Sequence, residues 1–178
     1  QHSLSSDGKT LYFIRGKPSR SGVKNQDIYF TSKNDDGSWT NPELLSDKIN
    51  TPEKEESVHI HPDGRTLYFS SNGHVGMGGL DLYVSRKDEK GEWGDPVNLG
   101  YPINTYAEEN SILVSSSGHL AYYSSDRAGG YGDFDLYSFE LYQDVRPNPL
   151  NFARGRVTDA ETGEPVSASL HLDTLNVV

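Results

Sequence analysis

The sequence predicts an all-β fold of three β-propeller blades, followed by the first strands of a β-sandwich. Asp27, Asp81 and Asp135 each open a D-(I/L)-Y segment, and these segments follow one another at intervals of 54 residues. Trp39 and Trp93 keep the same interval. A repeat of about 40 to 60 residues that lacks long stretches of helical periodicity is typical of propeller blades.

Other short segments repeat in the same order. Residues 49–51 and 103–105 both read Ile-Asn-Thr, and Glu55 recurs as Glu109. The turns Asp7-Gly8 and Asp63-Gly64 are 56 residues apart, so a difference of two residues is expected before the D-(I/L)-Y strand. Asp-Gly favours a tight turn between antiparallel strands, because glycine accepts a positive φ.

The second repeat divides into four antiparallel strands. β-branched and aromatic residues fill them, and large side chains are expected between blades. The predicted strands are 57–61, 66–71, 80–86 and 92–99.

The third repeat lacks its outer strand. After Asp135-Leu136-Tyr137 the chain continues to Leu141 with no Gly-x-Trp segment. Three blades do not close a ring, which typically needs four to eight. We therefore expect these blades to be a fragment of a larger, six-bladed-like ring.

Residues 1–141 resemble the PD40 repeat, a WD40-like propeller repeat related to that of TolB. The resemblance rests on DGKTLYF, DGRTLYFSSNGHVGMGGLDLY and SSDRAGGYGDFDLYSFEL, which recur in order. A Pro-rich linker is expected over 142–151. Residues 152–178 resemble the start of a carboxypeptidase-regulatory-like sandwich. Its G-x-V-x-D-x-x-T-G-x-P-V pattern is matched at Gly155, Val157, Asp159, Thr162, Gly163, Pro165 and Val166.

This domain order is similar to that of OmpA-family envelope proteins of Bacteroidetes, including a peptidoglycan-anchored propeller component of the type IX secretion system. The resemblance implies a periplasmic or outer-membrane-associated scaffold. Its partners would be other envelope proteins, such as outer-membrane or secretion-complex subunits. A lipid anchor and any peptidoglycan-binding domain would lie outside this chain.

Composition excludes several other classes of partner. The net charge of −10 disfavours nucleic acid. The sequence has no apolar stretch long enough to span a membrane. Because the chain contains no cysteine, it has neither disulfides nor thiolate metal sites.

Two groups of residues could bind a metal, although no cofactor is expected. Asp126, Asp133 and Asp135 could offer oxygen ligands to Ca²⁺. His59 and His61 flank one residue of a strand and therefore point to one face, where they could bind a transition metal. In the alternative interpretation, the recurrent Asp accepts hydrogen bonds from the neighbouring loop and the histidines form a polar strand face.

The residues favour a non-catalytic role over an enzymatic one. The Gly-rich loops precede strands, whereas phosphate-binding loops precede helices. A serine hydrolase would need a G-x-S-x-G elbow, which is absent. Glu55 and Glu109 could line a channel mouth, but capping of loop N–H groups is favoured. A propeller glycoside hydrolase or lyase, or a Ca²⁺-dependent glycan-binding module, stays an alternative to the scaffold.

Overall fold

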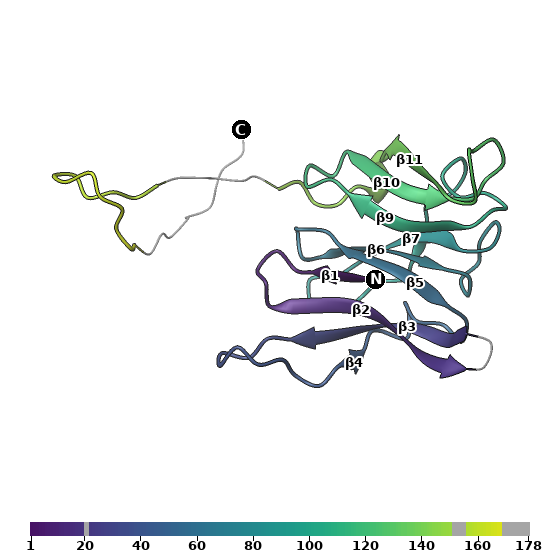
Figure 1. Ribbon diagram of the computed structural model, residues 1–178, viewed down its shortest axis with the longest axis horizontal. Coiled ribbons are helices and arrows are strands. Elements are labelled where there is room, and N and C mark those ends of the chain that lie inside the picture. Colours follow the sequence, from purple (N-terminus) through teal and green to yellow (C-terminus); the bar gives the residue numbers. More distant parts are fainter. Residues whose placement is uncertain (20–21, 151–155, 169–178) are drawn as a thin grey trace.

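The computed structural model describes residues 1–19, 22–150 and 156–168 of the chain. Three antiparallel sheets stack face to face, each being one blade (Figure 1). Blade 1 contains β1 (His2–Leu4), β2 (Thr10–Ser19), β3 (Gly22–Ser32) and β4 (Glu43–Leu44). Blade 2 contains β5 (Glu55–Ile60), β6 (Thr66–Ser71), β7 (Asp81–Arg86) and β8 (Val97–Asn98). Blade 3 contains β9 (Glu109–Val114), β10 (Leu120–Ser125) and β11 (Asp135–Glu140).

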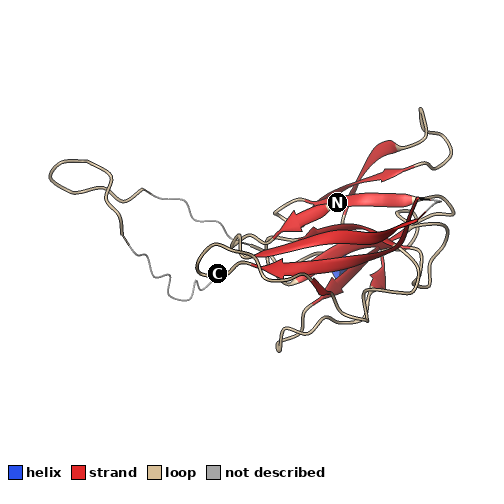
Figure 2. Ribbon diagram, turned by 60° about the horizontal axis from the view of Figure 1, so that its bottom comes forward, coloured by secondary structure: helices blue, strands red, loops and turns tan. Residues whose placement is uncertain are grey.

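This arrangement confirms the predicted all-β fold with three propeller-type blades. Blade 3 has three strands, as the missing Gly-x-Trp segment predicts. The outer strand of blade 2 is shorter than the predicted 92–99, because regular pairing is confined to β8 and an isolated bridge joins Lys87 to Trp93. Loops connect the long strands at both ends of each sheet (Figure 2).

The first two strands of each blade are joined by a turn that contains a glycine. Gly8, Gly64 and Gly118 have φ angles of 69°, 68° and 72° at equivalent positions. The Asp63 carboxylate accepts hydrogen bonds from the N–H groups of Arg65 and Thr66, each at 2.9 Å. The Asp-Gly pair therefore sets the turn geometry that the sequence predicts.

Each pair of neighbouring blades buries its own apolar cluster. The residues that meet between blades 1 and 2 are Tyr12, Ile28, Leu45, Ile49, Val58, Ile60, Leu67, Phe69, Tyr83 and Trp93. Between blades 2 and 3 they are Tyr68, Leu82, Val84, Leu99, Ile103, Ile112, Val114, Ala121, Tyr123, Leu141 and Val145. Repeat-equivalent residues form the two clusters, so the same packing is used twice.

The segment after β11 packs on the propeller. It contains the 3₁₀ helix η1 (Gln143–Val145), and Val145 is buried. The Tyr68 hydroxyl donates to the Val145 carbonyl at 2.6 Å, and Arg86 donates to the Asp144 and Arg146 carbonyls. Val145 joins the apolar cluster between blades 2 and 3, as Trp93 joins the cluster between blades 1 and 2. Residues 142–148, which fall in the predicted linker, thus contact the blades.

Residues 156–168 contain a turn within the expected start of the sandwich. The Asp159 carboxylate accepts hydrogen bonds from the N–H groups of Glu161 and Thr162, and Gly163 has a φ of 72°. An isolated bridge joins Thr158 to Pro165. The remainder of the predicted sandwich start, at 152–155 and 169–178, lies outside the described residues. Within the described ranges, no helix has the length and hydropathy needed to cross a membrane.

Candidate functional site

The Gly-rich loops are held by the aspartates that open β7 and β11. The Asp81 carboxylate accepts the Met77 N–H at 2.5 Å, and Asp135 accepts the Tyr131 N–H at 2.7 Å. A Cβ atom at Gly76 or Gly130 would collide with the carboxylate of the corresponding aspartate. These contacts agree with the structural role expected of the repeated aspartates. Burial raises the pKa of Asp81.

Glu55 and Glu109 lie buried beneath the loops that enter blades 2 and 3. Glu109 accepts hydrogen bonds from the Thr105 N–H at 2.9 Å and the Thr105 hydroxyl at 2.7 Å. Glu55 makes the same two contacts with Thr51, at 3.2 and 2.8 Å. This confirms the loop-capping interpretation for both. Burial raises the pKa of Glu55, although the hydroxyls of Ser71 and Thr51 donate to its carboxylate.

The three aspartates considered for Ca²⁺ are engaged separately or exposed. Asp126 accepts the Glu108 N–H at 2.8 Å, and Asn72 accepts the Lys54 N–H at 2.9 Å in the same place of blade 2. Asp133 is exposed. Among the described residues, no group of three His, Cys, Asp or Glu side chains is arranged to hold a metal ion.

His59 and His61 lie at the side of blade 2 that faces blade 3. His61 is fully buried, and its Nε2 donates to the Ser115 carbonyl at 3.2 Å. His59 packs against the ring of Tyr68, with 6.5 Å between ring centroids. Burial lowers the pKa of His59 to about 4. Both imidazoles therefore contribute to the contact between blades.

Two further side-chain interactions go beyond the sequence expectations. Asn50 and Asn104 each use their side-chain amide to bind the backbone of the residue after the repeated aspartate. Arg127 donates to the buried Glu109 carboxylate at 3.2 Å and lies over the rings of Tyr123 and Tyr137. The recurrence of Ile-Asn-Thr was a signal for the first feature. Arg127 gives no repeat signal, because its position in blade 2 is a glycine.

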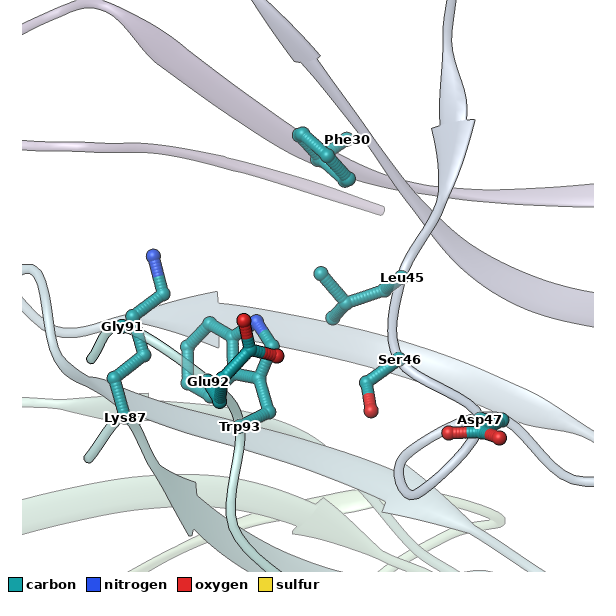
Figure 3. Close-up of a pocket in the computed structure, with 8 residues that line it drawn as sticks. All are labelled: Phe30, Leu45, Ser46, Asp47, Lys87, Gly91, Glu92 and Trp93. Carbon is teal, nitrogen blue, oxygen red and sulfur yellow. The ribbon is translucent and has the colours of Figure 1, made fainter.

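A surface groove of about 410 Å³ opens between the outer parts of blades 1 and 2 (Figure 3). Blade 1 supplies an apolar wall and an acidic loop, and blade 2 supplies a tryptophan with charged neighbours. The lining residues are Phe30, Leu45, Ser46, Asp47, Lys87, Gly91, Glu92 and Trp93.

The groove combines one amine with two carboxylates. The Lys87 ammonium lies 4.9 Å from the centre of the Trp93 ring, and burial together with Arg65 lowers its pKa. Trp93 is only 8% exposed, and its ring also meets Tyr12 edge to face at 6.3 Å between centroids. Because Lys87 covers the indole, the ring offers little open face for stacking a sugar.

The fold of this chain is similar to that of solved β-propeller proteins. TolB from Acinetobacter baumannii matches with a TM-score of 0.53 and 16% identity, over 79% of this chain and 29% of TolB. The chain has a TolB-like propeller fold. Prolyl oligopeptidase B from Galerina marginata matches with a TM-score of 0.46 and 14% identity, over 83% of this chain and 20% of the oligopeptidase. No protein-family model matches the chain, and no curated protein matches it significantly.

Proposed function

We propose that the chain is a non-catalytic interaction module of a Gram-negative cell-envelope protein of the OmpA-family type. It binds other envelope proteins, such as outer-membrane or type IX secretion subunits, and acts in the periplasm or at the outer membrane. The proposal rests on the groups that the acidic side chains bind. Glu55, Glu109, Asp81 and Asp135 all accept hydrogen bonds from loops of their own blades.

This use of the carboxylates supports a scaffold over a glycoside hydrolase. A hydrolase needs two carboxyl groups that face a substrate across about 5 to 9.5 Å. Glu55 and Glu109 are fully buried under their loops. Their hydrogen bonds fix the entry of each blade, which gives a rigid platform for binding.

The groove between blades 1 and 2 is the surface that we assign to a protein partner. Asp47 and Glu92 offer carboxylates at its rim, and Phe30 and Leu45 offer apolar contact. A peptide segment with a basic and an apolar side chain would complement this lining. The covered face of Trp93 favours a polypeptide over a glycan.

Site-directed photo-crosslinking in the cell envelope tests this function. A photoreactive residue at Glu92 is expected to capture a specific envelope protein, whereas the same residue at Lys33, outside the groove, does not. The purified chain is expected to show no glycoside hydrolysis and no shift of its melting temperature with Ca²⁺. Cytoplasmic fractionation of the protein, or turnover of a glycan by the purified chain, would overturn the proposal.

A further inference from the structure

His74 occupies in blade 2 the place that Arg127 occupies in blade 3. The Nε2 atom of His74 donates to the Ile49 carbonyl at 2.8 Å. The Arg127 guanidinium donates to the carbonyl of Ile103, which is the residue equivalent to Ile49. Two side chains from different positions of the repeat therefore bind the same backbone group.

The aromatic rings beside these two side chains are also equivalent. The centre of the His74 ring lies 5.9 Å from that of Phe69 and 5.2 Å from that of Tyr83. The Cζ atom of Arg127 lies 5.2 and 4.9 Å from the centres of the two corresponding rings of blade 3. A pair of aromatic rings thus supports the side chain in each blade.

A buried carboxylate lies near the nitrogen-bearing side chain in both blades. In blade 3, Arg127 donates to the Glu109 carboxylate at 3.2 Å. Glu55 is the equivalent residue of blade 2. Burial raises the pKa of Glu55, and charge on His74 acts in the opposite direction. A protonated His74 would therefore attract the Glu55 carboxylate as Arg127 attracts Glu109.

The glycine before His74 explains why the contact comes from a different position of the repeat. Gly73 is the sequence counterpart of Arg127, and a Cβ atom at Gly73 would collide with the Thr51 side chain. The contact is therefore made by the next residue. The replacement changes the chemistry, because a guanidinium is always charged whereas an ordinary imidazole gains its charge as the pH falls through about 6.5.

His74 belongs to the Gly-rich loop of blade 2, whose apolar side chains are open to solvent. Val75 is 95% exposed and Met77 is 49% exposed. The loop is attached at two places, by His74 to the Ile49 carbonyl and by the Met77 N–H to the Asp81 carboxylate at 2.5 Å. A stronger attachment at His74 would lower the frequency with which the loop opens.

We propose that the Gly-rich loop of blade 2 is a pH-sensitive element, which protonation of His74 fastens to its blade. The imidazolium gives the Ile49 carbonyl a charged donor and places a cation beside Glu55 and two aromatic rings. Each of these interactions is stronger for the imidazolium than for the neutral imidazole. The contacts then match those of Arg127, which holds the equivalent place of blade 3 at every pH. The inference does not depend on the proposed function.

The other titratable groups around His74 act in the opposite direction or keep their charge state. Burial raises the pKa of Asp81 and that of Glu55. As the pH falls further, a proton on Asp81 weakens its bond to the Met77 N–H, and a proton on Glu55 removes its attraction for His74. Burial also raises the pKa of Tyr83, whose hydroxyl donates to the His74 carbonyl and stays neutral.

The remaining charged groups near His74 lie on the segment that contains Ile49. Strand β6 carries no charged side chain. The charged residues of segment 46–54 are Lys48, paired with Asp95, Lys54, paired with Glu56, and the exposed Asp47 and Glu53. The attachment of the loop should therefore strengthen as the pH falls from about 8 to about 6, and weaken again in more acidic solution.

Native-state hydrogen exchange tests the proposal, with blade 3 as an internal control. The reporters are the amide of Met77 and that of its equivalent Tyr131, which donates to Asp135 at 2.7 Å. Protection factors, which correct for the direct effect of pH on exchange, are compared in the full chain at about pH 8 and about pH 6. The protection of Met77 is expected to increase about two- to fivefold at the lower pH, whereas that of Tyr131 stays constant.

Two substitutions of His74 separate its charge from its hydrogen bond. His74→Gln keeps a donor for the Ile49 carbonyl and should abolish the increase in Met77 protection at the lower pH. His74→Arg supplies a permanent cation and should protect Met77 equally at both pH values. The matched control is His2→Gln, at an exposed position of β1, which should leave the increase intact.

Three results would each overturn the proposal. They are an unchanged protection of Met77 in the wild type, an equal increase at Tyr131, and an increase that persists in His74→Gln. If a variant does not fold, the comparison of Met77 with Tyr131 in the wild-type chain still decides.

Discussion

The side-chain amide of Asn104 forms two hydrogen bonds of 2.8 Å with the backbone N–H and carbonyl of Leu82. This pairing continues the hydrogen bonding at the outer edge of β7 beyond the end of β8. We expect Asn104→Asp to lower the free energy of unfolding by about 1 to 3 kcal/mol, because a carboxylate oxygen would face the Leu82 carbonyl. Urea denaturation measures the loss.

The matched control for that variant is Asn34→Asp. Asn34 lies exposed in a turn, where its amide donates to the Ser38 hydroxyl at 2.9 Å. Its replacement should change the free energy of unfolding by less than about 0.5 kcal/mol. Equal losses in the two variants would contradict the clasping role of Asn104.

The glycine loop of blade 3 gives a second prediction. Gly130→Ala should reduce the free energy of unfolding by about 1 to 3 kcal/mol, because its Cβ would strike the Asp135 carboxylate. Gly132→Ala is the control, since no atom lies within 4 Å of a Cβ placed there. Thermal denaturation should show a lower melting temperature for the first variant alone. An equally small change in the melting temperature of both variants would mean that loop movement relieves the collision.

Arg127, which is partly exposed, forms an ion pair with the buried Glu109 at the entry to blade 3. Arg127→Ala should cost about 1 to 3 kcal/mol of unfolding free energy, because the fully buried Glu109 would lose its charge partner but keep the hydrogen bonds from Thr105. Arg15→Ala serves as the control, since Arg15 is exposed and lies over the ring of Tyr29 at 5.6 Å. The Arg15→Ala variant should lose about 1 kcal/mol or less of unfolding free energy. Chemical denaturation of both variants at pH 7 measures the two losses in the free energy of unfolding.

The buried imidazole of His59 predicts a pH-dependent stability. Its pKa falls from an ordinary value of 6.5 to about 4 in the folded state, so the unfolded chain binds a proton first as the pH falls. Wild-type stability should therefore decrease between about pH 6.5 and pH 4, by up to about 1.4 kcal/mol per pH unit.

His59→Leu should remove this pH dependence of the stability, because leucine does not bind a proton. Leucine suits the site, since Leu113 occupies the equivalent position in blade 3. Denaturation curves across that pH range measure the slope. The control is His2→Leu, at an exposed position of β1. An unchanged slope in His59→Leu would show that the imidazole is accessible to protons in the folded state.

The repeat made the blades predictable, since Asp27, Asp81 and Asp135 fall on the same structural position. Side-chain roles were predictable only where the same residue type recurred. Asp126 looked unique because Asn72 is its counterpart, yet an amide oxygen accepts a loop N–H as a carboxylate does. Arg127 has no counterpart to reveal it.

The segment after β11 was harder to interpret for a different reason. Its prolines suggest a linker, and no repeat partner exists for η1. Its position depends on Val145 fitting between blades and on Arg86 reaching the carbonyls of Asp144 and Arg146. Such contacts between distant residues follow from tertiary packing, and no repeated sequence pattern indicates them.

The two faces of a blade are different, and this gives the stack a direction. Trp93 faces the preceding blade, whereas Leu99 and Ile103 face the following one. A blade inserted between two others would match both neighbours only in the same orientation. Blades of this kind can therefore be duplicated or exchanged only in one orientation. The order of the blades in the sequence then becomes their order in space.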